Sequence, residues 1–120
     1  MKVAVSAEGN TLESRVDMRF GRAKHFIVVD IETGDYEAVD NEQILNIPQG
    51  AGIQAAQTVA QLGVENVISG HIGPNAFRTL NAAGVGIFLA GEDTVAETIE
   101  RFKRGELENV GEPDVEGHWV

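Results

Sequence analysis

The sequence contains no cysteine, and it is poor in proline, in aromatic residues and in basic side chains. Its 120 residues include 3 prolines, 1 tryptophan, 1 tyrosine and 5 phenylalanines. The absence of cysteine excludes disulfides, thiol nucleophiles, CxxC redox motifs and metal sites built on cysteine thiolates. Catalysis or metal binding through a thiol is therefore excluded.

Long hydrophobic runs are also absent. The longest, such as FIVV and GIFLA, are far below the roughly 18 residues that a membrane-spanning helix needs. The first ten residues, MKVAVSAEGN, lack the apolar stretch of a signal peptide. We therefore expect a cytoplasmic protein that has no membrane partner.

Basic residues are scarce and unevenly distributed. The chain has 9 Lys and Arg against 19 Asp and Glu, so its net charge is −10, and such a chain repels nucleic acid phosphates. We expect no nucleic acid partner. Nevertheless, Arg15, Arg19, Arg22 and Lys24 fall within ten residues, whereas residues 30–50 carry six acids and no base. This basic cluster is either a solvated loop that offsets its acidic neighbours or a site for a small anion.

Several catalytic motifs are missing. The chain has no P-loop, no G-x-S-x-G nucleophile motif and no H-E-x-x-H metal motif. Gly50–Ala55 matches the loose dinucleotide pattern G-x-G-x-x-G/A, but it follows Pro48 instead of a buried strand. The sequence therefore shows no evident nucleophile and no evident acid–base pair.

The order of elements predicts one α/β domain over residues 1–105, followed by an acidic, flexible tail over residues 106–120. The pattern of apolar residues predicts strands at 2–6, 25–31, 36–40, 66–70 and 85–90, and helices at 52–62, 74–83 and 94–103. Asp93 is the expected N-cap of the third helix. The long polar loop over residues 6–24 has few apolar anchors, so we expect it to be mobile.

Right-handed crossovers and a meander of the first three strands predict a five-stranded mixed sheet in the order 3-2-1-4-5, with three helices on its faces. Strands 1 and 4 then lie side by side, and their carboxyl ends form a topological switch point, where open α/β sheets bind ligands. The expected core is a set of apolar residues on these elements: Val3, Val5, Ile27, Val29, Ile53, Ala56, Ala60, Val67, Ile68, Phe77, Leu80, Ile87, Leu89, Val95, Ile99 and Phe102.

Glycine-rich loops are expected to meet at this switch point. Residues 50–52 open the first helix, and residues 69–73 open the second at Pro74. Helix N-termini that follow glycines present free N–H groups, which favour anions. The candidate binding residues are Arg19, Phe20, Gly21, Arg22, Lys24, Gly50, Gly52, Gly70, His71 and Gly73.

Histidine is the remaining candidate metal ligand. His71 lies in the second glycine loop, and His25 begins a strand beside the basic cluster. None of the three histidines has a partner at metal-binding spacing. Each of the two therefore has two interpretations, either as a ligand contributed by its loop or as an ordinary surface or capping residue.

The ordered segments RFGRAKHFIVVD (19–30), GAGIQAA (50–56), SGHIGPNAFRTLNAAGVGIF (69–88) and TVAETIERFKRGEL (94–107) resemble the dinitrogenase iron–molybdenum cofactor biosynthesis family. That family includes NifX, NafY and the C-terminal domain of NifB. The resemblance covers residues 1–108 and implies a ribonuclease-H-like, three-layer α/β fold. In the nitrogenase branch a histidine precedes the Phe-Gly of the first segment, and Arg19 stands there in this chain.

The resemblance implies a function in carrying an anionic metal cluster. The leading hypothesis is a non-enzymatic, monomeric carrier that binds an iron–molybdenum or iron–sulfur type cluster and exchanges it with metallocofactor assembly proteins. In this hypothesis Arg19, Arg22 and Lys24 hold the charge, and His71 or His25 acts as ligand. Two alternatives stay open: a protein-interaction module that uses the acidic hairpin or the tail, and an enzyme acting on a small anionic metabolite.

Overall fold

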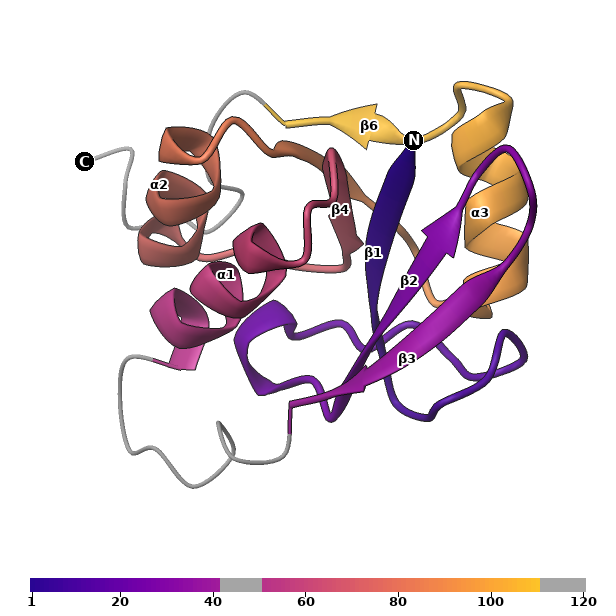
Figure 1. Cartoon of the computed structure of the whole chain (residues 1–120), viewed down its shortest axis with the longest axis horizontal. Helices are drawn as coiled ribbons and strands as arrows, with labels where there is room; N and C mark the ends of the chain where they lie inside the picture. Colours follow the sequence, from indigo (N-terminus) through magenta and orange to yellow (C-terminus); the bar gives the residue numbers. More distant parts are fainter. Residues whose placement is uncertain (42–50, 111–120) are drawn as a thin grey trace.

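The chain folds into three layers, with one sheet between two sets of helices. The computed structural model describes residues 1–41 and 51–110. Helices α1 and α2 lie side by side on one face of the sheet, and α3 covers the other face (Figure 1). The elements in chain order are β1 (Lys2–Ala7), the 3₁₀ turn η1 (Phe20–Arg22), β2 (His25–Asp30), β3 (Tyr36–Asp40), α1 (Ala51–Gln61), β4 (Asn66–Ser69), α2 (Pro74–Ala82), β5 (Gly86–Leu89), α3 (Val95–Lys103) and β6 (Glu108–Asn109).

The sheet has the order β3-β2-β1-β4-β5-β6. β1 pairs antiparallel with β2 and parallel with β4, and β4 pairs parallel with β5. This confirms the α/β fold class and the predicted order of the first five strands. The structure adds a sixth strand, because Leu89 and Phe88 pair antiparallel with Glu108 and Asn109. Two residues that the sequence assigned to a flexible tail, Glu108 and Asn109, thus form the strand at one edge of the sheet. Residues 111–120 lie outside the described part.

Alternation along the strands divides the core into two halves. Ala4, Phe26 and Val67 face α1 and α2, whereas Val5 and Ile68 face α3. Burial of apolar side chains on both sides of one sheet is the main source of stability in such a fold. β1 and β4 are central, so their side chains are shielded on both faces, and only Lys2 and Asn66 at their amino ends are exposed or partly exposed.

The predicted core is correct for the strands except at Leu89, and it is partly wrong for the helices. α1 buries Ala51, Ala55, Ala56 and Val59. Ile53 and Ala60 are only partly buried, and so are Phe77, Leu89 and Phe102. In α1 small alanines pack against the sheet because they permit a close approach, and the larger side chains lie at the margins of the interface. Buried aromatic residues that the prediction missed are Phe20 and Phe26, whose ring centroids are 5.3 Å apart.

The N-cap of α3 is Thr94 and not the predicted Asp93. The Thr94 hydroxyl accepts a hydrogen bond from the Glu97 amide, and the Glu97 carboxylate accepts one from the Thr94 amide. This reciprocal capping box has the sequence signature T-x-x-E, which would have identified the correct residue. Asp93 instead forms an ion pair with Arg101 at 3.4 Å.

The long loop after β1 is anchored, contrary to the expectation of mobility. Val16 is 2% exposed, and its amide donates to the Asp93 carbonyl at 2.9 Å. The amides of Val95 and Ala96 donate to carbonyls of the loop in return. The loop therefore forms a strap across the start of α3, which the polar composition of the loop did not indicate.

Candidate functional site

All three helices begin at the same edge of the sheet, where β1 and β4 end. Two of them, α1 and α2, begin beside η1 and enclose a pocket of about 210 Å³. Its lining has no charged side chain and comes from η1, the start of α1, and the N-cap and first turn of α2: Phe20, Gly21, Gly52, Ile53, Gly73, Pro74, Asn75 and Ala76. The pocket lies at the topological switch point that the sequence predicted.

Two glycines allow η1 to pack tightly on α1. A Cβ atom at Gly21 would lie 2.8 Å from the Gly52 Cα, which is closer than two such atoms can approach. A Cβ atom at Gly52 would lie 3.4 Å from the Ala76 Cβ of α2. These glycines therefore have a packing role in addition to lining the pocket.

Gly73 has no packing role of this kind. It is the N-cap of α2, with φ −74° and ψ 170°, a conformation that any residue adopts. A Cβ atom built on it meets nothing within 4 Å, although Ser, Thr, Asp and Asn are the preferred N-cap residues. The absence of a side chain at this position leaves space in the pocket and leaves the first-turn amides of α2 without a side-chain cap.

The electrostatics of the pocket favour an anion. The first turns of α1 and α2 contain no acidic residue, whereas the first turn of α3 contains Glu97. Early N–H groups in a helix have no intrahelical acceptor, and the helix dipole places partial positive charge there. Two helix ends of this type therefore point toward the same pocket.

Asp17 shapes the turn that leads into η1. Its side chain is 5% exposed, and one carboxylate oxygen accepts the Arg19 amide at 2.9 Å. The same oxygen lies 3.6 Å from the Arg19 Nε. The Phe20 amide then donates to the His71 carbonyl at 3.3 Å, so Arg19 and His71 lie side by side. No motif in the sequence indicated this role of Asp17.

Two buried serines join the loop to the strand ends. The Ser6 hydroxyl donates to the Asp17 carbonyl at 2.7 Å and lies 2.8 Å from the Ser69 Oγ. Both serines are fully buried at the carboxyl ends of β1 and β4. This pair fixes the position of the long basic loop relative to the loop after β4. No motif in the sequence indicated the contact between the two serines.

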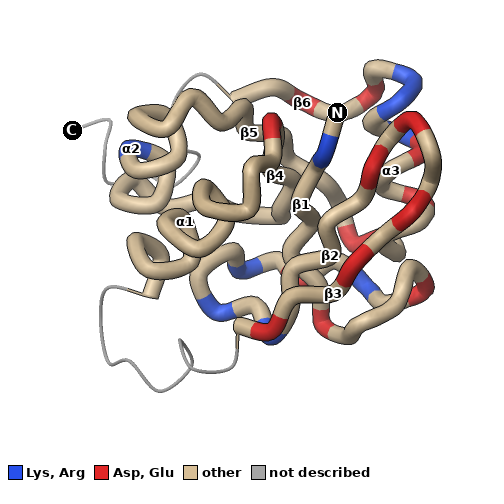
Figure 2. The backbone as a smooth tube through the Cα atoms, viewed as in Figure 1, with Lys and Arg blue, Asp and Glu red and all other residues tan. Residues whose placement is uncertain are grey.

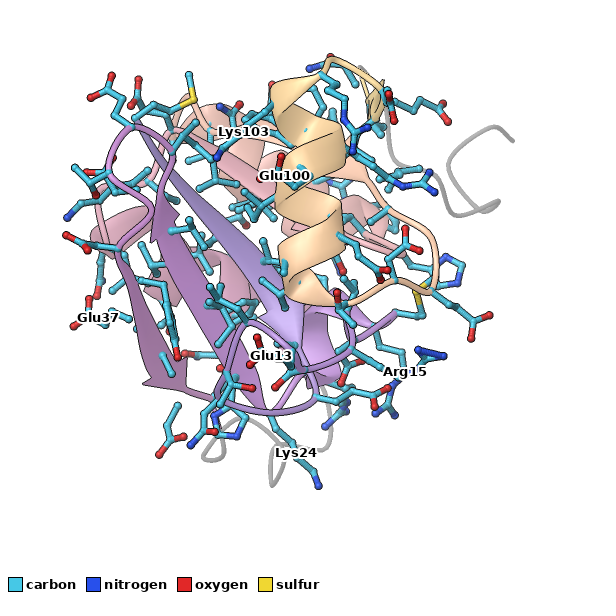
Figure 3. The ribbon with its side chains drawn as sticks, turned by 90° about the vertical axis from the view of Figure 1, so that its right-hand side faces the viewer. Glu13, Arg15, Lys24, Glu37, Glu100 and Lys103 are labelled. Atoms are coloured by element: carbon cyan, nitrogen blue, oxygen red, sulfur yellow. The ribbon has the colours of Figure 1, made fainter. Side chains whose placement is uncertain are left out.

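The basic residues surround the pocket without lining it. Arg19 and Arg22 flank the two pocket residues of η1, and the Arg19 side chain is 69% exposed. Lys24 follows at the start of β2, and its side chain extends into solvent (Figure 3). Figure 2 shows blue positions grouped beside the start of α1, with one red position at the end of β3 next to them and the other red positions of β3 farther along the hairpin. Arg19, Arg22 and Lys24 of the predicted basic cluster therefore form a rim of positive charge near the pocket. Arg15 does not belong to this rim, because it pairs with Thr94 at the start of α3.

The structure separates the two candidate histidines. His71 is exposed in the loop between β4 and α2, beside Arg19. His25 is on the face of β2 that α3 covers. Every second residue of a strand points to the same face, and Ile27 and Val29 pack in the half-core beside α3. Its Nδ1 lies 2.9 Å from an Asp40 carboxylate oxygen. His25 is thus not brought to the pocket, and sequence spacing could not reveal on which face it lies.

Two further predicted glycines have different outcomes. Gly70 lies against Met18, since a Cβ atom there would lie 2.8 Å from the Met18 Cα. Its smallness lets the basic loop pass close to the end of β4. Gly50 lies outside the described residues. Ile53, Pro74, Asn75 and Ala76 line the pocket but were not among the predicted site residues.

The described residues contain no group of three or more His, Asp or Glu side chains placed to hold a metal ion. Within the same residues, no helix is long and apolar enough to cross a membrane. The chemistry that the pocket offers is therefore hydrogen bonding from backbone amides and attraction by nearby guanidinium groups.

Comparison with known proteins agrees with this arrangement. The sequence profile of the family described as dinitrogenase iron-molybdenum cofactor matches residues 1–105. An uncharacterized protein of Methanocaldococcus jannaschii is 31% identical over 113 residues, which are 90% of each chain.

Solved structures extend the likeness to three dimensions. The apo form of the orange protein from Desulfovibrio gigas is 41% identical, with a TM-score of 0.92 over 95% of this chain and 96% of that one. A putative NifB protein from Thermotoga is 39% identical, with a TM-score of 0.83 over 97% and 98% of the two chains. With a family profile that spans residues 1–105 and relatives that share nearly the whole fold, this chain belongs to the dinitrogenase iron-molybdenum cofactor family.

Proposed function

We propose that this protein is a non-enzymatic carrier of an anionic metal cluster of the iron–molybdenum or iron–sulfur type. The observation that carries the proposal is the pocket formed by Gly21, Gly52 and Gly73 between two helix N-termini that have no acidic residue in their first turns. The family to which the chain belongs relates to the iron–molybdenum cofactor, which supports the choice of cargo.

Each group has a distinct role in this proposal. The amides at the start of α1 and α2 donate hydrogen bonds to the cluster, because they lack intrahelical acceptors. Arg19 and Arg22 neutralise its charge from the rim, and Lys24 attracts it from solvent. His71, exposed beside Arg19, is the candidate metal ligand.

Reversible binding is consistent with a carrier. Helix amides and exposed arginines hold an anion without forming bonds to its metal ions. A single histidine ligand adds one coordinate bond, whereas stable structural metal sites commonly use four protein ligands. Cluster assembly proteins are the partners that such a carrier requires, as donors and as acceptors.

Substitution of Gly73 tests the proposal, because it separates cluster binding from folding. The matched variants are Gly73→Asp and Gly73→Asn, which have nearly equal size and are both good N-caps. We expect both variants to melt at or above the temperature of the wild type. Aspartate would place a negative charge in the pocket, so we expect Gly73→Asp to retain at least tenfold less cluster than Gly73→Asn.

The measurement is anaerobic incubation of each protein with isolated iron–molybdenum cofactor, and separately with iron and sulfide. Gel filtration, metal analysis and absorbance spectroscopy then quantify the retained cluster. Equal retention by both Gly73 variants and the wild type would exclude this pocket as the binding site. Failure of the wild type to retain any cluster would refute the carrier function itself.

A further inference from the structure

The edge strand β3 carries a second functional surface, on the side of the molecule away from α1 and α2. Among the described residues, only β2 pairs with β3. Four of its five residues are exposed, and it contains no lysine, no proline and no break in its register. Natural edge strands are commonly protected by such features, since an unpaired edge is a template for another strand. Figure 3 shows β3 at the margin of the sheet, with Glu37 pointing away from α3.

The register determines which backbone groups face outward. The Asp30 amide donates to the Asp35 carbonyl at 2.9 Å, and the Asn41 amide donates to the Lys24 carbonyl at 2.8 Å. Hydrogen-bonded pairs alternate with non-bonded pairs along an antiparallel ladder. Counting in steps of two between these two bonds, the backbone groups of Glu37 and Val39 also point toward β2. The N–H and C=O groups of the three remaining residues point to the open side: Tyr36, Ala38 and Asp40.

The charge of this edge is uniformly negative. Residues 30–40 contain five acids and no base. Beside Glu37, on the face that α1 and α2 cover elsewhere, lies a hollow of about 270 Å³ whose lining includes Asp30 and Asp35. Three carboxylates against the single Lys2 make this hollow a receptor for a basic side chain.

The opposite face of β3 carries Tyr36, Ala38 and Asp40, so it is apolar except at its carboxyl end. Tyr36 is 43% exposed and, like Ala38, lies on the face that α3 only partly covers. Between the hairpin and α3 runs a groove of about 130 Å³ whose apolar lining residues are Leu12, Val29, Ala96 and Ile99. Glu100 and Lys103 of α3 line the same groove. Side chains of an added strand that point to this face would lie beside Tyr36 and Ala38, which are the apolar residues of β3 on this face.

We propose that β3 is a docking edge for an extended segment of another protein, in which basic and apolar side chains alternate. Such a segment would add a seventh strand to the sheet and bond to the outward backbone groups of Tyr36, Ala38 and Asp40. Residues opposite Glu37 would be basic and residues opposite Ala38 apolar, because directly paired residues share a face. The proposal does not depend on what the pocket binds.

A second copy of this chain is a poorer occupant. Pairing of two β3 strands would bring together two hairpins that each carry five acids, and like charges across a strand pair are destabilising. The acids thus protect the edge against self-association and leave it open to a basic strand. Charge complementarity is therefore the property that selects the partner.

The test uses the full chain and a capped synthetic peptide with four Lys-Val repeats. Binding is followed by fluorescence anisotropy of the labelled peptide at 150 mM salt. We expect Ala38→Pro, which removes an outward N–H, to weaken binding at least tenfold. Ala38→Thr keeps that N–H, so we expect its affinity to stay within twofold of the wild type. Glu37→Lys should weaken binding by reversing the charge beside the hollow.

Controls on the peptide side need no folding of a variant. The same peptide with every backbone amide methylated keeps its charge but cannot donate to the edge, and we expect its binding to fall at least tenfold. Equal binding of the methylated peptide, or no binding of the unmodified one to the wild type, would overturn the proposal. Self-association of the wild type that Ala38→Pro abolishes would overturn it in favour of a second copy. Circular dichroism and melting of each variant verify folding.

Discussion

At the scale of the residue, single polar groups in apolar surroundings decide both stability and site geometry. Asp17 is buried and uses its carboxylate to hold the Arg19 amide, so a residue in the core orients a residue of the basic rim. Thr98 shows the opposite case. It is fully buried in α3, and its hydroxyl has no hydrogen-bond partner in the structure.

Replacement of Thr98 by valine should stabilise the protein. Valine has nearly the same shape and helix propensity as threonine. The substitution removes a hydroxyl whose burial costs desolvation free energy that no hydrogen bond offsets. We expect the free energy of unfolding to rise by about 1 kcal/mol, measured by urea denaturation. Thr94→Val is the matched control and should lower it, because that hydroxyl caps α3. A less stable Thr98→Val protein would show that the hydroxyl is satisfied in solution.

At the scale of the element, the three helices begin at one edge of the sheet but differ in how their N-termini are satisfied. In α3 the carboxylate of Glu97, which belongs to the capping box, supplies a negative charge at the helix N-terminus. α2 begins with Gly73 and Pro74 and has no side-chain cap. Amides at the start of α3 therefore donate hydrogen bonds to the Thr94 side chain and to the long loop. The amides at the start of α2, which borders the pocket, have no side-chain cap.

The capping box of α3 should weaken in acid. The hydrogen bond from the Thr94 amide is the main cause that holds the pKa of Glu97 below its ordinary value, with a smaller contribution from the Thr94 hydroxyl. A carboxyl whose pKa is lower in the folded state stabilises fully above the unfolded-state pKa. That contribution is lost as the pH falls through the folded-state pKa.

The comparison of wild type with Glu97→Gln measures this effect. We expect the wild type to be more stable at pH 7, and the difference in melting temperature should shrink below about pH 4, where glutamate begins to protonate. Glu100→Gln leaves the cap intact and serves as the control. A difference that stays constant down to pH 2.5 would show that the Glu97 charge does not act through the cap.

At the scale of the whole molecule, one sheet joins two apolar half-cores, and charge is segregated around them. The bases of the long loop gather at the carboxyl ends of the parallel strands, whereas acids cover the β2–β3 hairpin (Figure 2). The positive rim and the negative edge adjoin at Lys24 and Asp40, since the Lys24 carbonyl accepts the Asn41 amide, but the pocket and β3 share no residue. One molecule can present a pocket for an anion and an edge for a basic segment at the same time.

Truncation of a core residue in the central strand β4 should destabilise the whole fold. Ile68 is fully buried in β4 and packs toward α3. We expect Ile68→Ala to lower the free energy of unfolding by about 2–5 kcal/mol, and Ile68→Val by about 1 kcal/mol, from lost burial and the remaining cavity. Urea unfolding followed by the NMR signals of Phe26 in one half-core and of Val95 in the other should give coincident transitions for both variants. Separate transitions would mean that the two half-cores unfold independently.

Local patterns in the sequence determined the elements and their order. Alternation in HFIVVD and the continuous apolar run of GIFLA identified strands, and Pro74 marked the start of α2. With the handedness of crossovers, these patterns were enough to predict the order of the first five strands and the edge at which the pocket lies. The basic cluster and the pocket glycines of α1 and α2 were predicted because they adjoin element ends, whereas Gly21 of η1 was indicated by the family resemblance.

Tertiary structure alone decided how those residues meet. The face on which His25 lies, the contact of Gly21 with Gly52, the Ser6–Ser69 pair and the sixth strand at Glu108 all depend on contacts between distant segments. Local propensity carries no information about which partner satisfies a buried polar group or how closely two backbones approach. Those outcomes follow from close packing and from the cost of leaving a buried polar group without a hydrogen bond, both of which arise only when the whole chain is folded.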